Sequence, residues 1–442
     1  MTKDWASMTP KEKREVRFKR WLDAENVQFV NAEAKEKYQS RVKRLIKVIK
    51  MEEPDRIPFN QAPGAFPAYY RGGNLKEHMY DFNKMRDDFI KFYHDFDMDF
   101  SMAPLTWPGK LFEILDFKLM QWPGHGVPEN GSFFQYVEGI YMKEDEYTEL
   151  LHNTNDFFLR KLLPRIAGTM EPLKYLASFD PSFFVPVGFV ASVGRPDVQN
   201  AFNQLAKAAE VFYDWARVIG ETVQQIYNLG FPQWGTSLAI TAYDMIADFL
   251  RGTKGIALDL YQNPDKLLEA IDKFTPMTIE MGLKNANTDI CPVIFIPLHK
   301  GADTFMSNKQ FEKFYWPCLR KLMLGLYEEG LVPFPLAEST YNSRLEIISD
   351  MPVASSIWWF EQIDMKKAKE IVGRNNCIAG GVPTSLLKTG SKPEIDECVK
   401  QLARDCGKGG GYLMSVSASV EQAVPENLHI LMDAINKYGK YQ

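Results

Sequence analysis

The sequence predicts a (β/α)8 barrel preceded by a helical N-terminal extension. Three observations lead to this fold class. Short apolar runs alternate with helical stretches over much of the chain, which is typical of a parallel sheet with helices outside it. Most of these runs are continuously apolar, as strands buried on both faces are. The chain has neither a GxGxxG motif after an early strand nor a GxxxxGK[ST] motif, so the open nucleotide-binding folds lose their main support.

The predicted extension covers residues 1–54, and the predicted barrel covers residues 55–442. The first 50 residues contain 14 Lys and Arg against 7 Asp and Glu. Apolar residues from Val42 to Ile49 recur at helical spacing, with basic side chains mostly on the other face. This pattern predicts a packed helix whose basic face meets solvent or an acidic partner.

Nine apolar runs are the candidate strands: Arg56–Gln61, Asp97–Pro104, Phe133–Val137, Phe183–Ala191, Pro292–His299, Leu331–Ala337, Ser355–Phe360, Asn376–Gly381 and Gly411–Ser417. Helices are expected between them. One begins at Asn263, an N-cap residue followed by Pro264 at the first helical position. Others cover residues 307–329 and 364–372. The turn-rich stretch 104–180 indicates an insertion or an elaborated N-terminal part.

Composition narrows the class of protein. The 442 residues carry a formal net charge of −5, which argues against non-specific nucleic-acid binding. No stretch approaches the ~18 apolar residues that a membrane helix needs, and the charged N-terminus does not resemble a secretory signal. The five cysteines are odd in number and show no CxxC pairing. We therefore expect a reduced, cytoplasmic protein without a disulfide framework.

Polar residues end three of the predicted strands. In barrels of this kind the function lies at the C-terminal ends of the strands, and His299, Glu338 and Glu361 occupy such positions. A histidine with two carboxylates can hold a divalent cation or act in acid–base chemistry. The three residues are therefore the candidate catalytic groups, and His299 and Glu338 are the candidate metal ligands. The alternative for each is a salt bridge or a satisfied polar group at the rim.

Five further residues are predicted to bind the substrate. Tyr341 and Arg344 follow the same run as Glu338, and His125 lies in a loop that could extend over the barrel mouth. Trp107 and Trp359 belong to an aromatic set that suits an aryl or otherwise apolar substrate, although aromatic residues also form ordinary core. The chain contains no HExxH or GxSxG motif, and nucleophilic Ser or Cys catalysis has no credible motif behind it.

Several short motifs occur in a recognisable order. Gly380-Gly381-Val382-Pro383 joins a strand to a helix, and Gly410-Gly411-Tyr412 precedes the helix start Pro425-Glu426-Asn427. Upstream lie Asp55-Arg56-Ile57-Pro58 and the segment from Asp248 to Gly252. Together these motifs resemble the uroporphyrinogen decarboxylase superfamily over roughly residues 40–442. The resemblance implies a (β/α)8 barrel from one of two branches. One branch decarboxylates porphyrinogens, and the other moves methyl groups between a corrinoid and a small substrate with the help of zinc.

The sequence departs from both branches. The Arg-Gln-Ala-Gly-Arg signature of the decarboxylases is replaced by Gln61-Ala62-Pro63-Gly64 without the flanking arginines. The cysteines that bind zinc in thiol-methylating relatives are absent from the matching segments Leu336–Ser339 and Ser417–Ser419. An oxygen-rich site with one imidazole remains, which suits a zinc ion with His and carboxylate ligands or catalysis by acid and base alone.

The resemblance favours a corrinoid-dependent methyltransferase that acts on a non-thiol donor such as a methoxy group. The chain contains no DxHxxG corrinoid-binding loop, so a separate corrinoid protein is the expected partner beside the small-molecule substrate. Two alternatives stay open. One is a decarboxylase of a tetrapyrrole or small carboxylate, with Arg344 holding the carboxylate. The other is a non-catalytic tetrapyrrole-binding protein. The oligomeric state is open, a dimer included.

Overall fold

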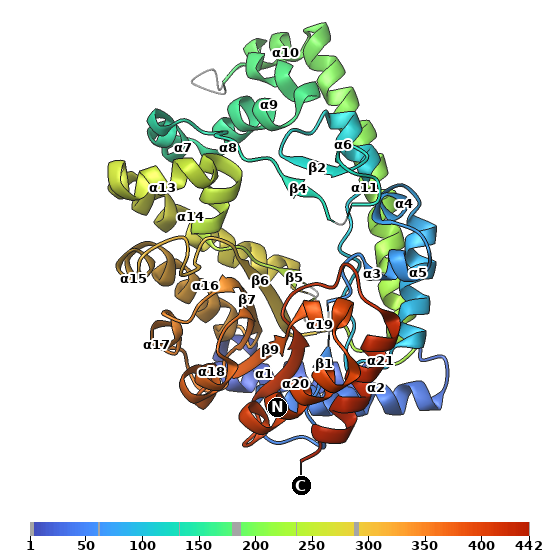
Figure 1. The fold of residues 1–442 in the computed structure, drawn as a ribbon. Helices are drawn as coiled ribbons and strands as arrows, with labels where there is room; N and C mark the ends of the chain where they lie inside the picture. The colour runs from blue at the N-terminus through green and yellow to red at the C-terminus, as the bar shows by residue number, and fades with distance from the viewer. Residues whose placement is uncertain are drawn as a thin grey trace.

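The computed structural model describes residues 4–60, 62–131, 133–178, 187–235, 237–286 and 291–441. Its largest sheet has seven parallel strands in the order β1-β10-β9-β8-β7-β6-β5. The strands are β1 (Phe59–Asn60), β5 (Ser237–Leu238), β6 (Val293–Leu298), β7 (Val332–Thr340), β8 (Ile357–Gln362), β9 (Cys377–Val382) and β10 (Tyr412–Val416). Figure 1 shows these strands in the lower part of the molecule, with helices outside them.

Backbone hydrogen bonds of residues 99–101 connect the two edges of the sheet and close it into a barrel. The Asp99 N–H donates to the Phe59 carbonyl at 3.0 Å, which attaches residues 99–101 to β1. The Ser101 N–H donates to the Pro232 carbonyl, and the Trp234 N–H donates to the Ser101 carbonyl, both at 2.8 Å. These bonds attach the same residues to the segment that leads into β5. Residues 99–101 thus take the place of the second barrel strand, although they form only a short bridge. The predicted (β/α)8 fold is confirmed.

Three predicted strands differ from the structure. Residues 97–104 do not form a regular strand; Ser101 makes an isolated parallel bridge with Gln233. Residues 133–137 contain β4 (Gln135–Tyr136), which belongs to a separate small sheet with β2 (Met120–Pro123) and β3 (Gly126–Val127). The run 183–191 is not a strand where it is described, since α10 (Val187–Val193) is helical; residues 183–186, like Gln61, lie outside the described residues.

An upper part lies over the C-terminal ends of the strands and contains the small sheet and short helices (Figure 1). Its helices, with those that connect it to β1, are α3 (Phe66–Tyr70), α4 (Leu75–Tyr80), α5 (Phe82–Asp95), α6 (Gly109–Leu115), α7 (Tyr147–His152), α8 (Thr154–Phe157), α9 (Leu163–Ile166) and α10. The 33-residue helix α11 (Pro196–Asn228) runs from the upper part down along the barrel.

The remaining helices surround the barrel. They are α12 (Ala242–Ile246), α13 (Gly252–Gln262), α14 (Pro264–Asn285), α15 (Asn308–Gln310), α16 (Trp316–Glu328), α17 (Leu345–Ile348), α18 (Met365–Ile371), α19 (Thr384–Thr389), α20 (Lys392–Leu402) and α21 (Pro425–Tyr438). Proline at the first helical position of α14 agrees with the predicted start after Asn263. In the part of the chain that the structure covers, no helix combines the length and apolarity needed to cross a membrane.

The N-terminal extension covers the bottom of the barrel. Its helices are α1 (Pro10–Asp23) and α2 (Ala32–Ile49). Trp21 and Tyr38 are fully buried in one cluster with inward-facing residues at the start of the strands, including Val293 and Val332. The barrel interior is therefore packed from below, as expected of a solid core rather than a pore.

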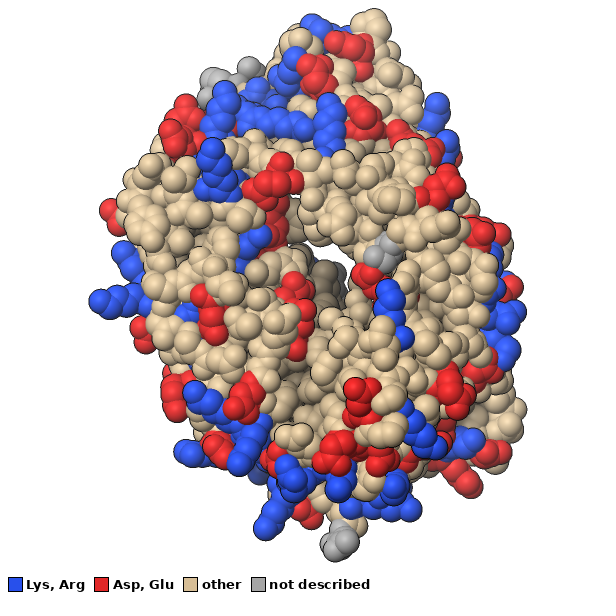
Figure 2. Space-filling model, in the orientation of Figure 1, with Lys and Arg blue, Asp and Glu red and all other residues tan. Residues whose placement is uncertain are grey.

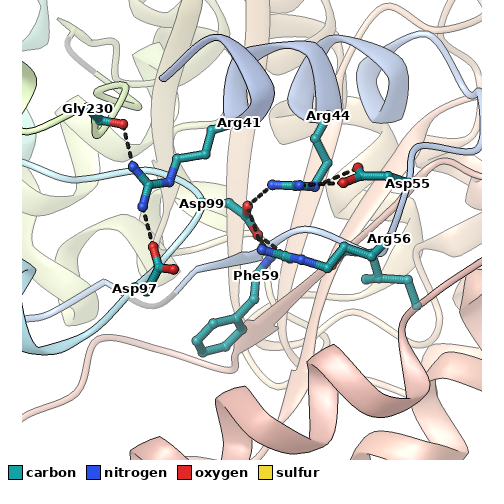
Figure 3. Close-up of polar contacts among 9 residues, drawn as sticks. Arg41, Arg44, Asp55, Arg56, Phe59, Asp97, Asp99 and Gly230 are labelled. Carbon is teal, nitrogen blue, oxygen red and sulfur yellow. Dashed lines mark hydrogen bonds and ion pairs between the residues drawn. The ribbon is translucent and has the colours of Figure 1, made fainter. Parts of the chain in front are cut away.

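A buried ion-pair network attaches α2 to β1 (Figure 3). Asp99 is 1% exposed and accepts hydrogen bonds from the guanidinium groups of Arg44 and Arg56. It also accepts the Phe59 backbone N–H at 2.7 Å. Arg44 continues the network to Asp55 at 2.8 Å through its Nε atom. One buried carboxylate therefore connects the extension to the first two positions of the barrel wall.

Candidate active site

Three strands direct polar residues toward the same end of the barrel interior. Side chains two residues apart on a strand share a face. Phe334 and Leu336 on β7 face the interior cluster, and the same alternation places Glu338 at its upper end. By the same rule His299 continues the inward face of β6, and Glu361 continues the inward face of β8 beyond Trp359.

His299 lies between two carboxylates. Its Nδ1 atom is 2.5 Å from Oδ2 of Asp248, and its Nε2 atom is 3.8 Å from Oε1 of Glu338. The side chain of His299 is 29% exposed and that of Glu338 is 41% exposed, so both reach the cavity above the barrel. The structure thus brings together His299 and Glu338 as the sequence predicted, and it adds Asp248.

Asp244 and Asp248 also belong to the site, although the sequence did not predict them as site residues. Asp244 lies on α12, and Asp248 lies on the π-helical turn Ala247–Arg251 that follows it. π-Helical turns are frequent at functional sites. Asp244 is fully buried; its Oδ1 accepts the Lys300 N–H at 2.9 Å and its Oδ2 accepts the Tyr315 hydroxyl at 2.5 Å. It therefore anchors the backbone next to His299.

Burial and the nearby charges shift the pKa values of three side chains in the site. Burial opposes protonation of His299, yet the bond from Asp248 and the charges of Asp244 and Glu338 raise the His299 pKa to about 9. Burial raises the pKa of Glu338 to about 7; the charge of His299 opposes this rise, and that of Glu361 adds to it. Burial and the charge of Asp248 raise the pKa of Asp244 to about 6. Near neutral pH the site therefore holds an imidazolium beside a carboxyl group that can give up a proton.

A cavity of about 530 Å³ lies over this pair, within the usual size range of small-molecule sites. Part of its wall comes from the upper part of the molecule, where Tyr136 on β4 packs edge-on against Phe249 at 6.2 Å. Figure 2 shows a hollow between the upper part and the barrel, with Asp and Glu side chains along its edge. The cavity is lined by Phe133, Phe134, Tyr136, Val137, Glu138, Gly139, Ala247, Asp248, Gly252, Thr253, His299, Lys300 and Glu338.

Glu361 lines a second, neighbouring cavity of about 360 Å³ over β8, β9 and β10. Its Oε2 atom accepts the backbone N–H of Ser339 at 2.5 Å. Since Ser339 directly follows Glu338, Glu361 touches the site through the backbone.

Arg344 and Tyr341 lie away from the cavity, contrary to their predicted role as substrate-binding residues. Arg344 is 1% exposed, and its guanidinium donates to the carbonyls of Gly301, Ala302 and Met306 and to the side chain of Asn308. These bonds occupy the guanidinium and hold the loop after β6. Tyr341 is fully buried and packs edge-on against Phe311 at 6.4 Å. Both side chains stabilise the barrel wall rather than face a ligand.

The other predicted substrate-binding residues are also absent from the lining of this cavity. Trp359 is 3% exposed, donates its indole N–H to the Val416 carbonyl at 3.0 Å and stacks on Phe334, so it belongs to the packed floor below the site. Trp107 stacks on Trp215 of α11 at 5.8 Å. His125 stacks on Trp122 at 4.6 Å in the upper part. Trp107 is half-buried and His125 is exposed, each at contacts of its own.

The structure provides only part of the ligand set that the predicted zinc ion would need. Nε2 of His299 and Oε1 of Glu338 face each other, and the bond from Nδ1 to Asp248 resembles the support that metal-binding histidines receive. Catalytic zinc sites use three protein ligands. Over the described ranges, no group of three or more His, Cys, Asp or Glu side chains is arranged to hold a metal ion. The residues therefore do not fit a resident zinc ion.

Comparison with protein families settles the relationship. The model of the uroporphyrinogen decarboxylase family matches residues 198–438, which is more than half of the chain. The chain belongs to the uroporphyrinogen decarboxylase family. Among solved structures, this family member is similar to a methyltransferase from Methanosarcina mazei, with a TM-score of 0.57 and 13% sequence identity. The alignment covers 89% of this chain and 98% of that chain, so the two share the fold. No curated protein gives a significant match.

The Asp248→Asn variant tests the electrostatics of the site. An amide in place of the carboxylate removes the negative charge that stabilises the imidazolium. We expect the pKa of His299 to fall from about 9 toward its ordinary value of about 6.5. Titration of the imidazole signals by NMR measures the shift. A pKa that stays near 9 in this variant would show that Asp248 does not set the charge of His299.

Proposed function

We propose that the protein is a methyltransferase that removes the methyl group of a methoxy donor and transfers it to a corrinoid on a separate protein. The observation that carries this proposal is the pair of Glu338 and His299 in the aromatic-walled cavity at the barrel rim. An alkoxide or phenolate leaves poorly unless its oxygen receives a proton, and a carboxyl group with a pKa of about 7 is suited to supply one.

Glu338, His299 and Asp248 have different roles in the proposed reaction. As the methyl carbon forms its bond to the external acceptor, the C–O bond breaks and the oxygen keeps the bonding electrons. Glu338 donates its proton to that oxygen, which leaves as a hydroxyl group. The resulting carboxylate lies beside the positively charged His299, which stabilises it, and Asp248 holds the imidazole in place through Nδ1. Solvent then returns a proton to Glu338.

The walls of the cavity favour an apolar or aryl methyl ether. Phe133, Phe134, Tyr136 and Val137 provide a largely apolar surface. The carboxylates of Glu138 and Asp248 and the carboxyl group of Glu338 face the same space. The ammonium group of Lys300 donates to the Thr253 hydroxyl at 2.9 Å and lies 3.8 Å from Oδ1 of Asp248. His299 and Lys300 are both paired with Asp248, so a neutral donor suits the site better than a substrate with several carboxylates.

The alternative of a decarboxylase has less support in the geometry. It assigned Arg344 to hold the substrate carboxylate, but that guanidinium is buried and bound to carbonyls of the loop after β6. The alternative of a non-catalytic binding protein is also less well supported. A cluster of perturbed acid and base groups at the mouth of a cavity is typical of catalytic sites.

The pH dependence of methyl transfer tests the role of Glu338. The acid must be protonated, so kcat is expected to be highest below pH 7 and to fall as the pH rises through the pKa of about 7. A further decline is expected near pH 9, where His299 loses its charge. The rate of methylcobalamin formation from cob(I)alamin and a methoxyphenol, measured between pH 5.5 and 9.5, gives this profile. A kcat that increases through pH 7 would contradict proton donation by Glu338.

A further inference from the structure

Strand β7 is irregular directly beside the candidate acid. Ala337 pairs with Phe360 of β8, but the next pairing joins Thr340 to Gln362. Three residues of β7 therefore advance against two of β8, which defines a β-bulge. Within it, Ser339 has φ of +63°, a left-handed conformation that non-glycine residues rarely adopt. Bulges are over-represented next to active sites, where they redirect a side chain.

The bulge changes what Glu338 would otherwise face. Continuing the register beyond Ala337 and Phe360 would place Glu338 directly opposite Glu361. Two like charges in that position repel each other. In the structure Oε2 of Glu361 instead accepts the N–H of Ser339 at 2.5 Å, and Glu338 lies 3.8 Å from Nε2 of His299. The hydrogen bond thus compensates for the unusual backbone, and the carboxylate of Glu338 is free to meet the imidazole.

We infer that Glu361 is a positioning residue: its hydrogen bond to the Ser339 N–H holds the β7 bulge that directs Glu338 toward His299. The expected change in kcat rests on the proposed function, whereas the expected position of Glu338 does not. Glu361 was a candidate catalytic group in the sequence, and here it acts on the reaction through the backbone of β7. Its own carboxylate lines the neighbouring cavity.

Two conservative variants distinguish the effect of the Glu361 side-chain length from the effect of its charge. Glu361→Gln keeps the length and an oxygen acceptor but removes the charge. Glu361→Asp keeps the charge but withdraws the acceptor from the Ser339 N–H by one methylene. At a pH well below 7, where Glu338 stays protonated, we expect Glu361→Gln to keep kcat within about threefold, and Glu361→Asp to lower kcat by roughly 10–100-fold with KM within about threefold. A misplacement of ~1 Å at a catalytic group has an effect of this size.

Crystal structures of the same variants give a readout that needs no substrate. The distance between Nε2 of His299 and Oε1 of Glu338 should stay near 3.8 Å in Glu361→Gln and lengthen in Glu361→Asp. Glu346→Ala, at an exposed position of α17, is the matched control and should change neither readout.

Three results would overturn the inference. Equal losses of kcat in both variants would show that the charge of Glu361 matters rather than its hydrogen bond. An unchanged distance in Glu361→Asp would show that the bulge stands without this contact. A lengthened distance in Glu361→Gln would show that an amide oxygen does not replace the carboxylate. If the wild-type protein transferred no methyl group, the distances would still decide the inference, so its failure and that of the proposed function are distinguishable.

Discussion

Replacing Glu338 by Gln is expected to lower kcat for methyl transfer by roughly 10²–10⁴-fold, the usual contribution of a general acid. The amide has the same shape as the carboxyl group but has no proton of comparable acidity to give to the leaving oxygen. In the proposed function, substrate binding depends mainly on the aromatic wall formed by the upper part of the molecule. KM should therefore stay within about threefold of the wild-type value, as expected when an interaction is lost only in the transition state.

The matched control is Glu346→Gln, eight residues further along the same connection and exposed to solvent. It should leave kcat and KM unchanged. Steady-state kinetics with a methoxyphenol and cob(I)alamin measure both variants. A kcat of Glu338→Gln within about threefold of wild type would remove Glu338 from the mechanism. A large rise in KM with unchanged kcat would instead make it a binding residue.

Replacing Asp99 by Ala is expected to lower the free energy of unfolding by about 3–5 kcal/mol, because it leaves buried charges without their partner. Arg44 and Arg56 both lose an acceptor, and so does the backbone N–H of Phe59. Arg44 is itself 8% exposed and has little access to solvent. Urea unfolding followed by far-UV circular dichroism measures the change.

Asp97→Ala is the control on the same segment. Its carboxylate also pairs with an arginine of α2, Arg41, but it is 74% exposed, and Arg41 keeps its bond to the Gly230 carbonyl. We expect a smaller loss than for Asp99→Ala, because Arg41 keeps that carbonyl and the attraction of the nearby Asp99 charge. Equal losses in the two variants would show that burial does not decide the strength of these pairs.

The contribution of Asp99 to the free energy of unfolding should depend on pH. Although burial opposes it, the charges of Arg56 and Arg44 hold the pKa of Asp99 below its ordinary value. The contribution of Asp99 is therefore complete above the ordinary carboxyl pKa and is lost as the pH falls through the lower folded value.

The sequence predicted the barrel because continuous apolar runs such as those of β6, β7 and β8 are long and lie between clear helical patterns. It could not predict the second position of the barrel, where residues 99–101 and 232–234 meet through only a few backbone bonds. Those bonds depend on tertiary placement rather than on local propensity. The strand predicted at 133–137 formed in a different sheet for the same reason.

The candidate site was predicted in part. His299 and Glu338 could be found because each ends an inward-facing row of a strand. Asp244 and Asp248 could not be found that way, since they lie on a helix after β5, a two-residue strand. Their signal was two carboxylates four residues apart in an apolar helical stretch, which places both on one face. The burial of Arg344 could not be predicted, because its position in the sequence does not show that loop carbonyls surround its guanidinium.

An isotopic label on the methyl group distinguishes methyl transfer from decarboxylation. A methoxyphenol with a ¹³C-labelled methyl group is incubated with the wild-type protein and cob(I)alamin, and the products are followed by NMR. We expect one labelled methylcobalamin for each phenolic hydroxyl formed, and almost none of either product with Glu338→Gln. Release of carbon dioxide from a carboxylate analogue, with no label on the corrinoid from any methoxy donor offered, would contradict the account and favour a decarboxylase.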